Sequence, residues 1–301
     1  MDHAPVWRNM DSYKFLRELV SIPSPSGEEE QVGQFLVEQM TALGLEAHID
    51  KAGNAVGTTG DPKAKQTIVL LGHMDTVPGD IPVRRRGNLL YGRGTVDAKG
   101  PLAVFILATA RVALNLNNSH ITVIGAVEEE AFSKGARHLA KTMDAPDFCI
   151  IGEPNYWEYV TIGYKGRMWV DYTWEQPDTH STGDQIGPAE KGITFWNQLV
   201  DYADKRNNGQ EGRFDTLDPG LRDFRTYSDG LNTGVRMSIA LRLPPGFKPA
   251  VLKRKMKGWA EGAKLEHAPL DMPYRMEDKN NRLVRAMLKA IRAEGGRPRF
   301  K

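Results

Sequence analysis

Acidic and imidazole side chains follow apolar, strand-like runs of this sequence. His73 and Asp75 close the run TIVLLGHMD, and a spacing of two places both side chains on the same side of an extended segment. A histidine there can bind a cation through one ring nitrogen. The aspartate can accept the N–H of the other nitrogen and fix the tautomer. This pair therefore predicts a metal ligand and the group that orients it.

Carboxylates that could bind a cation occur in three further motifs. Asp97 lies in the glycine-rich turn GRGTVDAKG before a helical pattern, where a carboxylate has room to bridge two cations. Glu128, Glu129 and Glu130 follow the run ITVIGAV, and Glu153 follows CIIG. Adjacent carboxylates repel one another, and a divalent cation relieves that repulsion. Each motif alone has an ordinary structural explanation, but their repetition at successive strand ends predicts a site for two cations.

The elements that must position these side chains alternate between two patterns. Short apolar runs predict strands at residues 67–71, 121–127 and 148–151. Apolar residues at helical spacing predict helices over residues 11–20, 28–43, 99–115 and 135–143. The order predicts an α/β fold with a mainly parallel sheet and helices on both faces. The carboxyl ends of parallel strands meet at one edge of a sheet, where ligands bind.

The pattern changes after about residue 164. Residues 167–175 and 235–243 alternate as half-buried antiparallel strands do, and helices are predicted from Pro188 and over residues 249–262. We therefore expect an inserted α+β sandwich, or lid. The predicted domains are a catalytic α/β domain at 1–164, the lid at 165–271 and an apparently incomplete return to the catalytic domain at 272–301.

Composition excludes several classes of protein. Of 301 residues, 40 are Lys or Arg and 38 are Asp or Glu, so charge gives no case for a general nucleic-acid binder. The longest apolar stretch, residues 102–110, falls far short of the roughly 20 residues that cross a membrane. With one cysteine and no signal-peptide pattern in the first ten residues, we expect a cytoplasmic protein.

Four motifs together resemble a known family. HMDTVP, YGRGTVDAKG, VEEEAFSKG and IGEP are similar to those of the cocatalytic zinc aminoacylases and carboxypeptidases. That family includes acetylornithine deacetylase and succinyl-diaminopimelate desuccinylase, and the resemblance covers essentially the whole chain. It implies a metal-dependent hydrolase of linear amides. It also implies two Zn²⁺ per subunit, for which Co²⁺ is a possible substitute.

The resemblance also implies metal ligands. His73 and Glu153 match the ligands of one zinc, Asp97 matches the carboxylate that bridges the two ions, and Glu130 matches a ligand of the second. The family's last ligand is a histidine near its C-terminus, and the sequence up to Lys301 contains no match to it. We therefore expect one tightly held zinc and a weak second site.

Three further roles follow from the same resemblance. Glu129 matches the general base and Asp75 the residue that orients His73, although an alignment shifted by one residue would move the choice toward Glu128. His180 in DTHSTGD resembles a lid histidine that stabilises the oxyanion, often across a subunit interface. This implies a homodimer formed through the lid.

Four further stretches of the sequence point to a particular substrate within this family. GYKGR, LRDFRTYSDGLNTG, LRLPP and GGRPRFK are most similar to the branch of the family that acts on LysW, a small acidic amino-group carrier protein. Its members release lysine or ornithine from the side chain of the carrier's C-terminal glutamate in lysine and arginine biosynthesis. Basic runs at residues 84–86 and 253–257 suit either an acidic partner or a solvated face. Two alternatives stay open: a deacetylase or desuccinylase of small molecules, and a catalytically silent carrier-binding protein.

Overall fold

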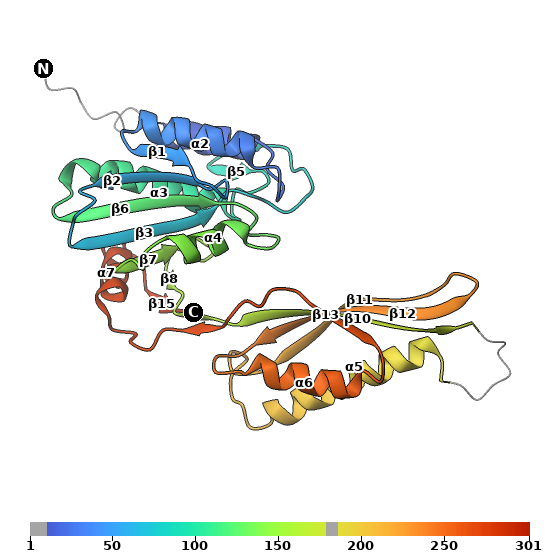
Figure 1. Ribbon diagram of the computed structural model, residues 1–301. Helices are drawn as coiled ribbons and strands as arrows, with labels where there is room; N and C mark the ends of the chain where they lie inside the picture. Colours follow the sequence, from blue (N-terminus) through green and yellow to red (C-terminus); the bar gives the residue numbers. More distant parts are fainter. Residues whose placement is uncertain (1–10, 179–185) are drawn as a thin grey trace, which may run out of the picture. The chain divides into compact units, whose positions relative to one another are not determined.

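The computed structural model describes residues 11–178 and 186–301 and divides into two compact units, Met1–Tyr156 and Trp157–Lys301. Figure 1 labels their elements. The described helices are α1 (Ser12–Ser21), α2 (Glu30–Ala42), α3 (Lys99–Val112), the 3₁₀ turn η2 (Ala113–Asn115), α4 (Lys134–Thr142), α5 (Pro188–Asn207), α6 (Pro249–Trp259) and α7 (Arg282–Ala293). Within these ranges, no helix is both long and apolar enough to cross a membrane.

The first unit is built on a five-stranded sheet in the order β1-β2-β6-β3-β7. Its strands are β1 (Glu46–Ile49), β2 (Ala55–Gly60), β3 (Gln66–His73), β6 (Ser119–Ala126) and β7 (Phe148–Ile151). A separate hairpin pairs β4 (Arg84–Arg86) with β5 (Leu89–Tyr91). Strands β6, β3 and β7 are parallel, whereas β2 runs antiparallel to β6 and β1 antiparallel to β2.

The sheet is therefore mixed, and the prediction of a mainly parallel sheet needs correction. The antiparallel part is a hairpin whose turn is held by Asp50. One carboxylate oxygen of Asp50 accepts the backbone N–H groups of Ala52, Gly53 and Asn54. The strands on either side, EAHI and AVGTTG, are short and rich in polar residues and glycine. They carry no continuous apolar run that would have marked them as strands.

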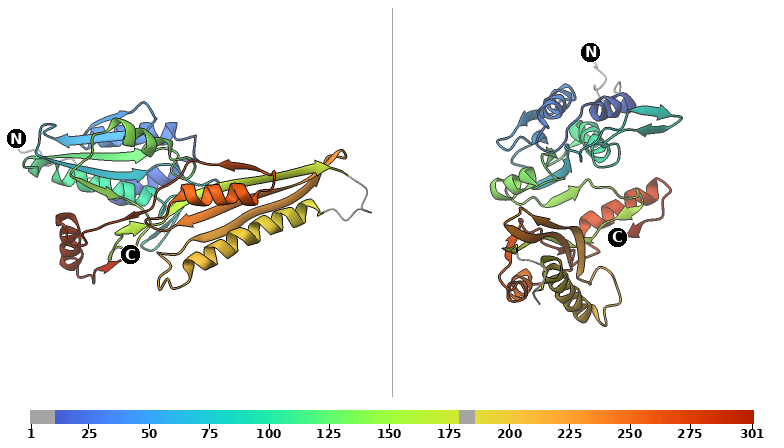
Figure 2. Two further views of the ribbon diagram at one scale, coloured as in Figure 1. Left: turned by 60° about the horizontal axis from the view of Figure 1, so that its bottom comes forward. Right: turned by 90° about the vertical axis from the view of Figure 1, so that its right-hand side faces the viewer.

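Helices cover both faces of this sheet, as predicted. On one face α1, α2 and α3 contribute to a core that includes Phe15, Leu36 and Ile106. On the other face α4 contributes Leu139, which packs against the buried Ile124 of β6. Figures 1 and 2 show the sheet between these helices. Burial on both faces explains the apolar runs within β3 and β6.

The parallel strands bring distant parts of the sequence to one edge. His73 ends β3 opposite Ala126, which ends β6, and Ile151 ends β7 opposite Leu71. Helix α3 begins at Lys99, two residues after Asp97. The acidic residues that follow each strand are consequently placed at the same edge of the sheet.

The second unit contains a four-stranded antiparallel sheet in the order β11-β12-β10-β13. Helices α5 and α6 share one core with it, as expected for an α+β sandwich, while β11 and β13 were not foreseen. Two short pairs of strands complete the unit. The domain boundaries that the sequence predicts, 1–164, 165–271 and 272–301, stay a prediction. Its strands are β8 (Tyr159–Val160), β9 (Gly163–Tyr164), β10 (Gly166–Pro177), β11 (Asp218–Ser228), β12 (Asn232–Leu243), β13 (Lys264–His267), β14 (Tyr274–Arg275) and β15 (Arg299–Phe300).

Candidate metal centre

The strand ends of the first unit gather acidic side chains around one buried histidine. The Nε2 atom of His73 lies 3.2 Å from an oxygen of Asp97, 3.9 Å from one of Glu153 and 4.0 Å from one of Glu129. Ligand atoms of His73, Asp97 and Glu153 all lie within 4.8 Å of one another, and so do those of His73, Glu129 and Glu130. Ligand atoms around one zinc are about 3–4 Å apart, because each lies about 2 Å from the metal. The predicted ligands of the first unit therefore meet at one place.

The other ring nitrogen of His73 faces Asp75. Its Nδ1 atom lies 3.0 Å from the backbone oxygen and 3.2 Å from the carboxylate Oδ1 of Asp75. Both side chains are buried, with exposed fractions of 1% and 0%. A proton on Nδ1 satisfies these acceptors and leaves Nε2 directed toward the carboxylate cluster.

Burial and mutual charge shift the pKa values in this cluster. Burial alone lowers the pKa of His73, but the hydrogen bond to Asp75 and the charges of Glu153, Asp75 and Glu129 raise it to about 9. Burial raises the pKa of Glu153 to about 7, with the charge of His73 opposing and the neighbouring carboxylates adding to the rise. Burial and the charges of Asp97 and Glu129 likewise raise the pKa of Glu130. Such shifts are typical of functional sites.

The pKa of Asp75 moves in the opposite direction. Burial alone would raise it, but hydrogen bonds from His73, from the Ser26 hydroxyl and from the backbone N–H groups of Glu130 and Glu129 lower it. The Ser26 hydroxyl donates to Oδ2 at 2.7 Å. Asp75 is consequently held as a carboxylate beneath the cluster.

The donor set fits a divalent cation. It offers one imidazole nitrogen and several carboxylate oxygens, which are ligands that zinc accepts. The side chains of Asp97, Glu129 and Glu153 keep exposed fractions of 53%, 44% and 44%, whereas that of His73 is 1% exposed. The cluster is therefore fixed at its base and open to solvent above, as a catalytic metal centre requires.

The segment before α2 supports the centre in a way that the sequence did not reveal. The Ser24 hydroxyl donates to the backbone oxygen of Met74 at 2.7 Å. The amino group of Lys99 is buried and donates to the backbone oxygens of Leu19 and Ile22 at 3.3 and 2.6 Å. Burial lowers the pKa of Lys99 to about 8, against the opposing charge of Asp75.

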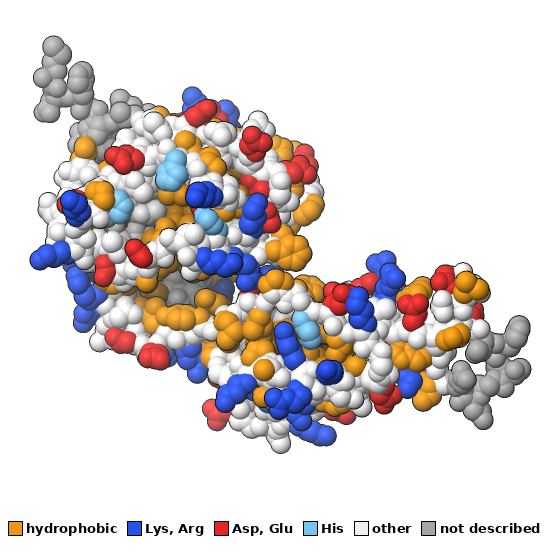
Figure 3. Space-filling view, in the orientation of Figure 1, with side chains coloured by type: hydrophobic (Ala, Val, Ile, Leu, Met, Phe, Trp, Pro, Cys, Tyr) orange, Lys and Arg blue, Asp and Glu red, His pale blue; other side chains and the backbone are white. Residues whose placement is uncertain are grey.

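Other residues named from the sequence lie elsewhere. His180 lies outside the described residues. The basic run at residues 253–257 lies on α6 of the second unit, and Figure 3 shows Lys and Arg side chains gathered over the helical side of that unit.

Comparisons with known proteins define the class. The chain belongs to peptidase family M20/M25/M40, and the sequence model of that family matches residues 69–301. It is 41% identical over 298 residues to the LysW-lysine hydrolase of Deinococcus radiodurans, an alignment that covers 96% of this chain and 81% of that protein. A LysW-lysine/LysW-ornithine hydrolase of Sulfurisphaera tokodaii is 36% identical over 172 residues, covering 57% of this chain and 47% of that protein.

Solved structures agree on the fold. The M20 family metallo-carboxypeptidase Sso-CP2 from Sulfolobus solfataricus has a TM-score of 0.77 at 17% identity and covers 97% of this chain and 85% of its own. Human carnosine dipeptidase 1 has a TM-score of 0.71 at 16% identity, with coverages of 98% and 86%. The family predicted from the four motifs is thus confirmed, and with it the assignment to metal-dependent hydrolases. The individual roles of the site residues stay predictions.

Proposed function

We propose that this protein hydrolyses the amide that joins lysine or ornithine to the carrier protein LysW. The observation that carries the proposal is the 41% identity, over 96% of the chain, to a LysW-lysine hydrolase. The acidic centre of the first unit supports it, because an unactivated amide needs a strong electrophilic site. The bond broken lies between the carrier's terminal glutamate side chain and the α-amino group of the amino acid.

We infer that zinc is the metal, with cobalt as a substitute. His73, Asp97 and Glu153 would hold one ion, and Glu130 with the shared Asp97 would hold the other. When bound, such ions polarise the scissile carbonyl and lower the pKa of water to about 7. The buried imidazole and the open carboxylates of the cluster are compatible with this assignment.

The chain's own residues would move the proton. Glu129 borders the cluster with a half-exposed side chain, so it can reach both water and substrate. As general base it takes a proton from the attacking water and then donates it to the departing amine. Asp75 acts through His73, because it fixes the tautomer that directs Nε2 toward the cluster.

We further propose a homodimer formed through residues 165–271, in which His180 stabilises the oxyanion that develops on the substrate. With a single cysteine, the chain cannot form an internal disulfide, which supports a cytoplasmic location. Light scattering after gel filtration measures the oligomeric state directly. A His180→Ala variant should keep its metal and lose turnover.

The substrate is tested by a panel offered to the metal-loaded protein. LysW-lysine and LysW-ornithine represent the proposal, and N-acetylornithine and N-succinyl-diaminopimelate represent the alternatives. We expect release of amino acid from a carrier-bound substrate and little turnover of the small molecules. Turnover of the small molecules alone would identify a small-molecule deacylase instead.

A further inference from the structure

Four successive backbone N–H groups at the metal centre donate to side chains. They belong to the segment from Val127 to Glu130, which follows β6, and each donor–acceptor distance is 3.0 Å. The acceptors in chain order are Asn54, Glu29 and, for the last two groups, the two oxygens of Asp75. Three side chains from distant parts of the sequence thus fix one short segment.

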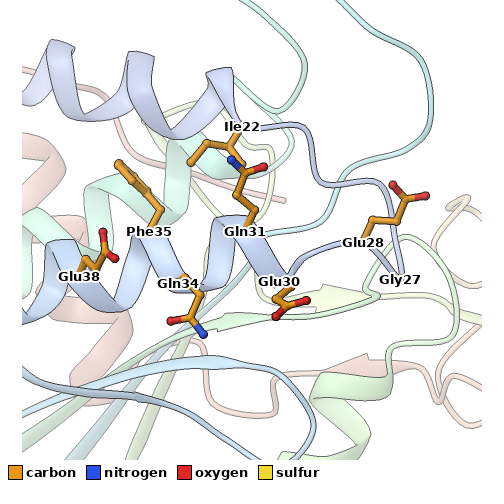
Figure 4. A pocket seen from close by; sticks show the side chains of 8 residues that line it. All are labelled: Ile22, Gly27, Glu28, Glu30, Gln31, Gln34, Phe35 and Glu38. Atoms are coloured by element: carbon orange, nitrogen blue, oxygen red, sulfur yellow. The ribbon is translucent and has the colours of Figure 1, made fainter.

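Glu29 is the acceptor whose role nothing above explains. It is the middle residue of the run Glu28-Glu29-Glu30, and only 6% of it is exposed. One oxygen accepts the N–H of Glu128 and the other accepts the N–H of Gly27, both at 3.0 Å. Its neighbours are exposed, and Figure 4 shows Glu28 and Glu30 lining an open hollow beside α2. A carboxylate that is buried between two exposed ones is therefore used to hold the backbone.

The backbone that Glu29 holds has an unfavourable conformation. Glu128 has a φ angle of 55°, in the left-handed region that costs a residue with a side chain about 1–2 kcal/mol. Such a conformation persists only where the surroundings impose it. The Glu128 N–H bond to a buried carboxylate is a charge-assisted hydrogen bond of the strong kind. It is well placed to impose that conformation.

In the run from Glu128 to Glu130, the left-handed conformation of Glu128 separates its side chain from those of Glu129 and Glu130. The carboxylate of Glu128 lies 3.4 Å from the amino group of Lys134. Glu129 and Glu130 have ligand atoms that gather with His73. The turn at Glu128 thus decides which members of the run face the cluster, and it places Glu129 and Glu130 there.

We propose that Glu29 is a positioning residue that sets the register of the Glu128–Glu130 run and so aims Glu129 and Glu130 at the metal centre. Asn54 anchors the preceding residue, with its own amide held by Asp50 Oδ2 at 2.8 Å and the Gly135 oxygen at 3.3 Å. Asp75 anchors the following two. The proposal rests on the proposed function only in taking the cluster to bind metal.

A double-mutant cycle on metal affinity tests this role. The metal-free wild type, Glu29→Ala, Glu130→Gln and the double variant are titrated with Co²⁺ in competition with a chromophoric chelator. Outer residues that orient ligands change metal affinity by about 10–100-fold, so we expect a loss of that size for Glu29→Ala. In the Glu130→Gln background the same change should have an effect within about twofold, because the ligand that Glu29 aims is gone.

Two controls separate aiming from general stability. Glu30→Ala removes the exposed neighbour and should leave Co²⁺ affinity within about twofold of the wild type. Thermal unfolding of the metal-free variants measures stability, and a purely structural role would lower the melting temperature without coupling to Glu130. Should Glu29→Ala fail to fold, Glu29→Gln retains the shape and one acceptor oxygen and should show a smaller loss that still depends on Glu130.

Additive losses in the cycle, or equal effects of Glu29→Ala and Glu30→Ala, would overturn the proposal. The titration uses no substrate. A wild type that binds Co²⁺ but releases no lysine from LysW-lysine would therefore contradict the proposed function and leave this inference intact.

Discussion

The carboxylate Oδ1 of Asp75 lies 3.2 Å from Nδ1 of His73, with both side chains buried beneath the carboxylate cluster. The same carboxylate accepts the backbone N–H groups of Glu129 and Glu130. Asp75 therefore connects the end of β3 to the segment after β6. A single side chain orients the imidazole and holds the two glutamates beside it.

Replacing Asp75 with asparagine should weaken metal binding by about 10–100-fold, as is usual for groups that orient a ligating histidine. The amide has one acceptor oxygen, so His73 and the two N–H groups can no longer all be satisfied. Competition with a chelator measures the affinity, and Glu28→Gln in the exposed part of the first unit is the control. An Asp75→Asn protein with the affinity of the control would show that this contact does not orient His73.

Substitutions of Glu129 and Glu130 should differ in their effects on turnover and on metal binding. Glu129→Gln is expected to lower turnover of LysW-lysine by about 10²–10⁴-fold, the usual contribution of a general base, while metal content is kept. Glu130→Gln should lose metal affinity as well as turnover, because a proposed ligand is removed. Metal analysis after dialysis distinguishes them. The reverse pattern would assign the base to Glu130.

Metal uptake is expected to release protons, in a number that rises as the pH falls. In the metal-free protein the pKa of His73 is raised to about 9 and that of Glu153 to about 7, and as the proposed ligands both groups must be deprotonated to bind metal. At pH 8 mainly His73 carries a proton, so about one is released, and at pH 6 both carry one, so about two are released. Metal affinity should fall over the same range.

Calorimetric titration in buffers of different ionisation enthalpy counts these protons. Uptake at pH 8 with no proton release would mean that His73 is neutral in the metal-free protein. It would contradict the electrostatic description of the cluster.

Gly135 should tolerate no side chain. A Cβ atom there would lie 2.1 Å from Oδ1 of Asn54 and 2.7 Å from the backbone nitrogen of Val127, so it would break the bond between them. We expect Gly135→Ala to lower the free energy of unfolding by about 1–3 kcal/mol, the usual cost of overpacking. Gly258→Ala in α6 has open space and is the control, expected to be neutral or stabilising. Chemical denaturation measures both, and equal effects would contradict the packing described.

The sequence revealed the parts of the fold that depend on apolar burial. Strands β3 and β6 carry apolar runs because helices cover both faces, and β7 is a shorter apolar strand at the sheet edge. The acids after these strands were visible as candidate ligands. Strand β11 was missed because LRDFRTYS mixes charged residues among its few apolar ones on a sheet edge. A half-exposed edge strand has no apolar run to identify it.

The supporting residues of the site could not be predicted for a different reason. Ser26, Glu29 and Asn54 act through hydrogen bonds to residues roughly 50 to 100 positions away. Nothing in SPSGEEE distinguishes the buried middle glutamate from its exposed neighbours. Only the tertiary structure shows which polar side chains hold the backbone of the metal centre.

The central claim is that this chain hydrolyses carrier-bound lysine with Glu129 as the base. Its most direct test is to incubate zinc-loaded protein with LysW-lysine and measure free lysine and the mass of the carrier. We predict that the carrier loses its lysine with the wild type and keeps it with Glu129→Gln of the same metal content. An intact carrier with the metal-loaded wild type, or equal release by the two proteins, would contradict the claim.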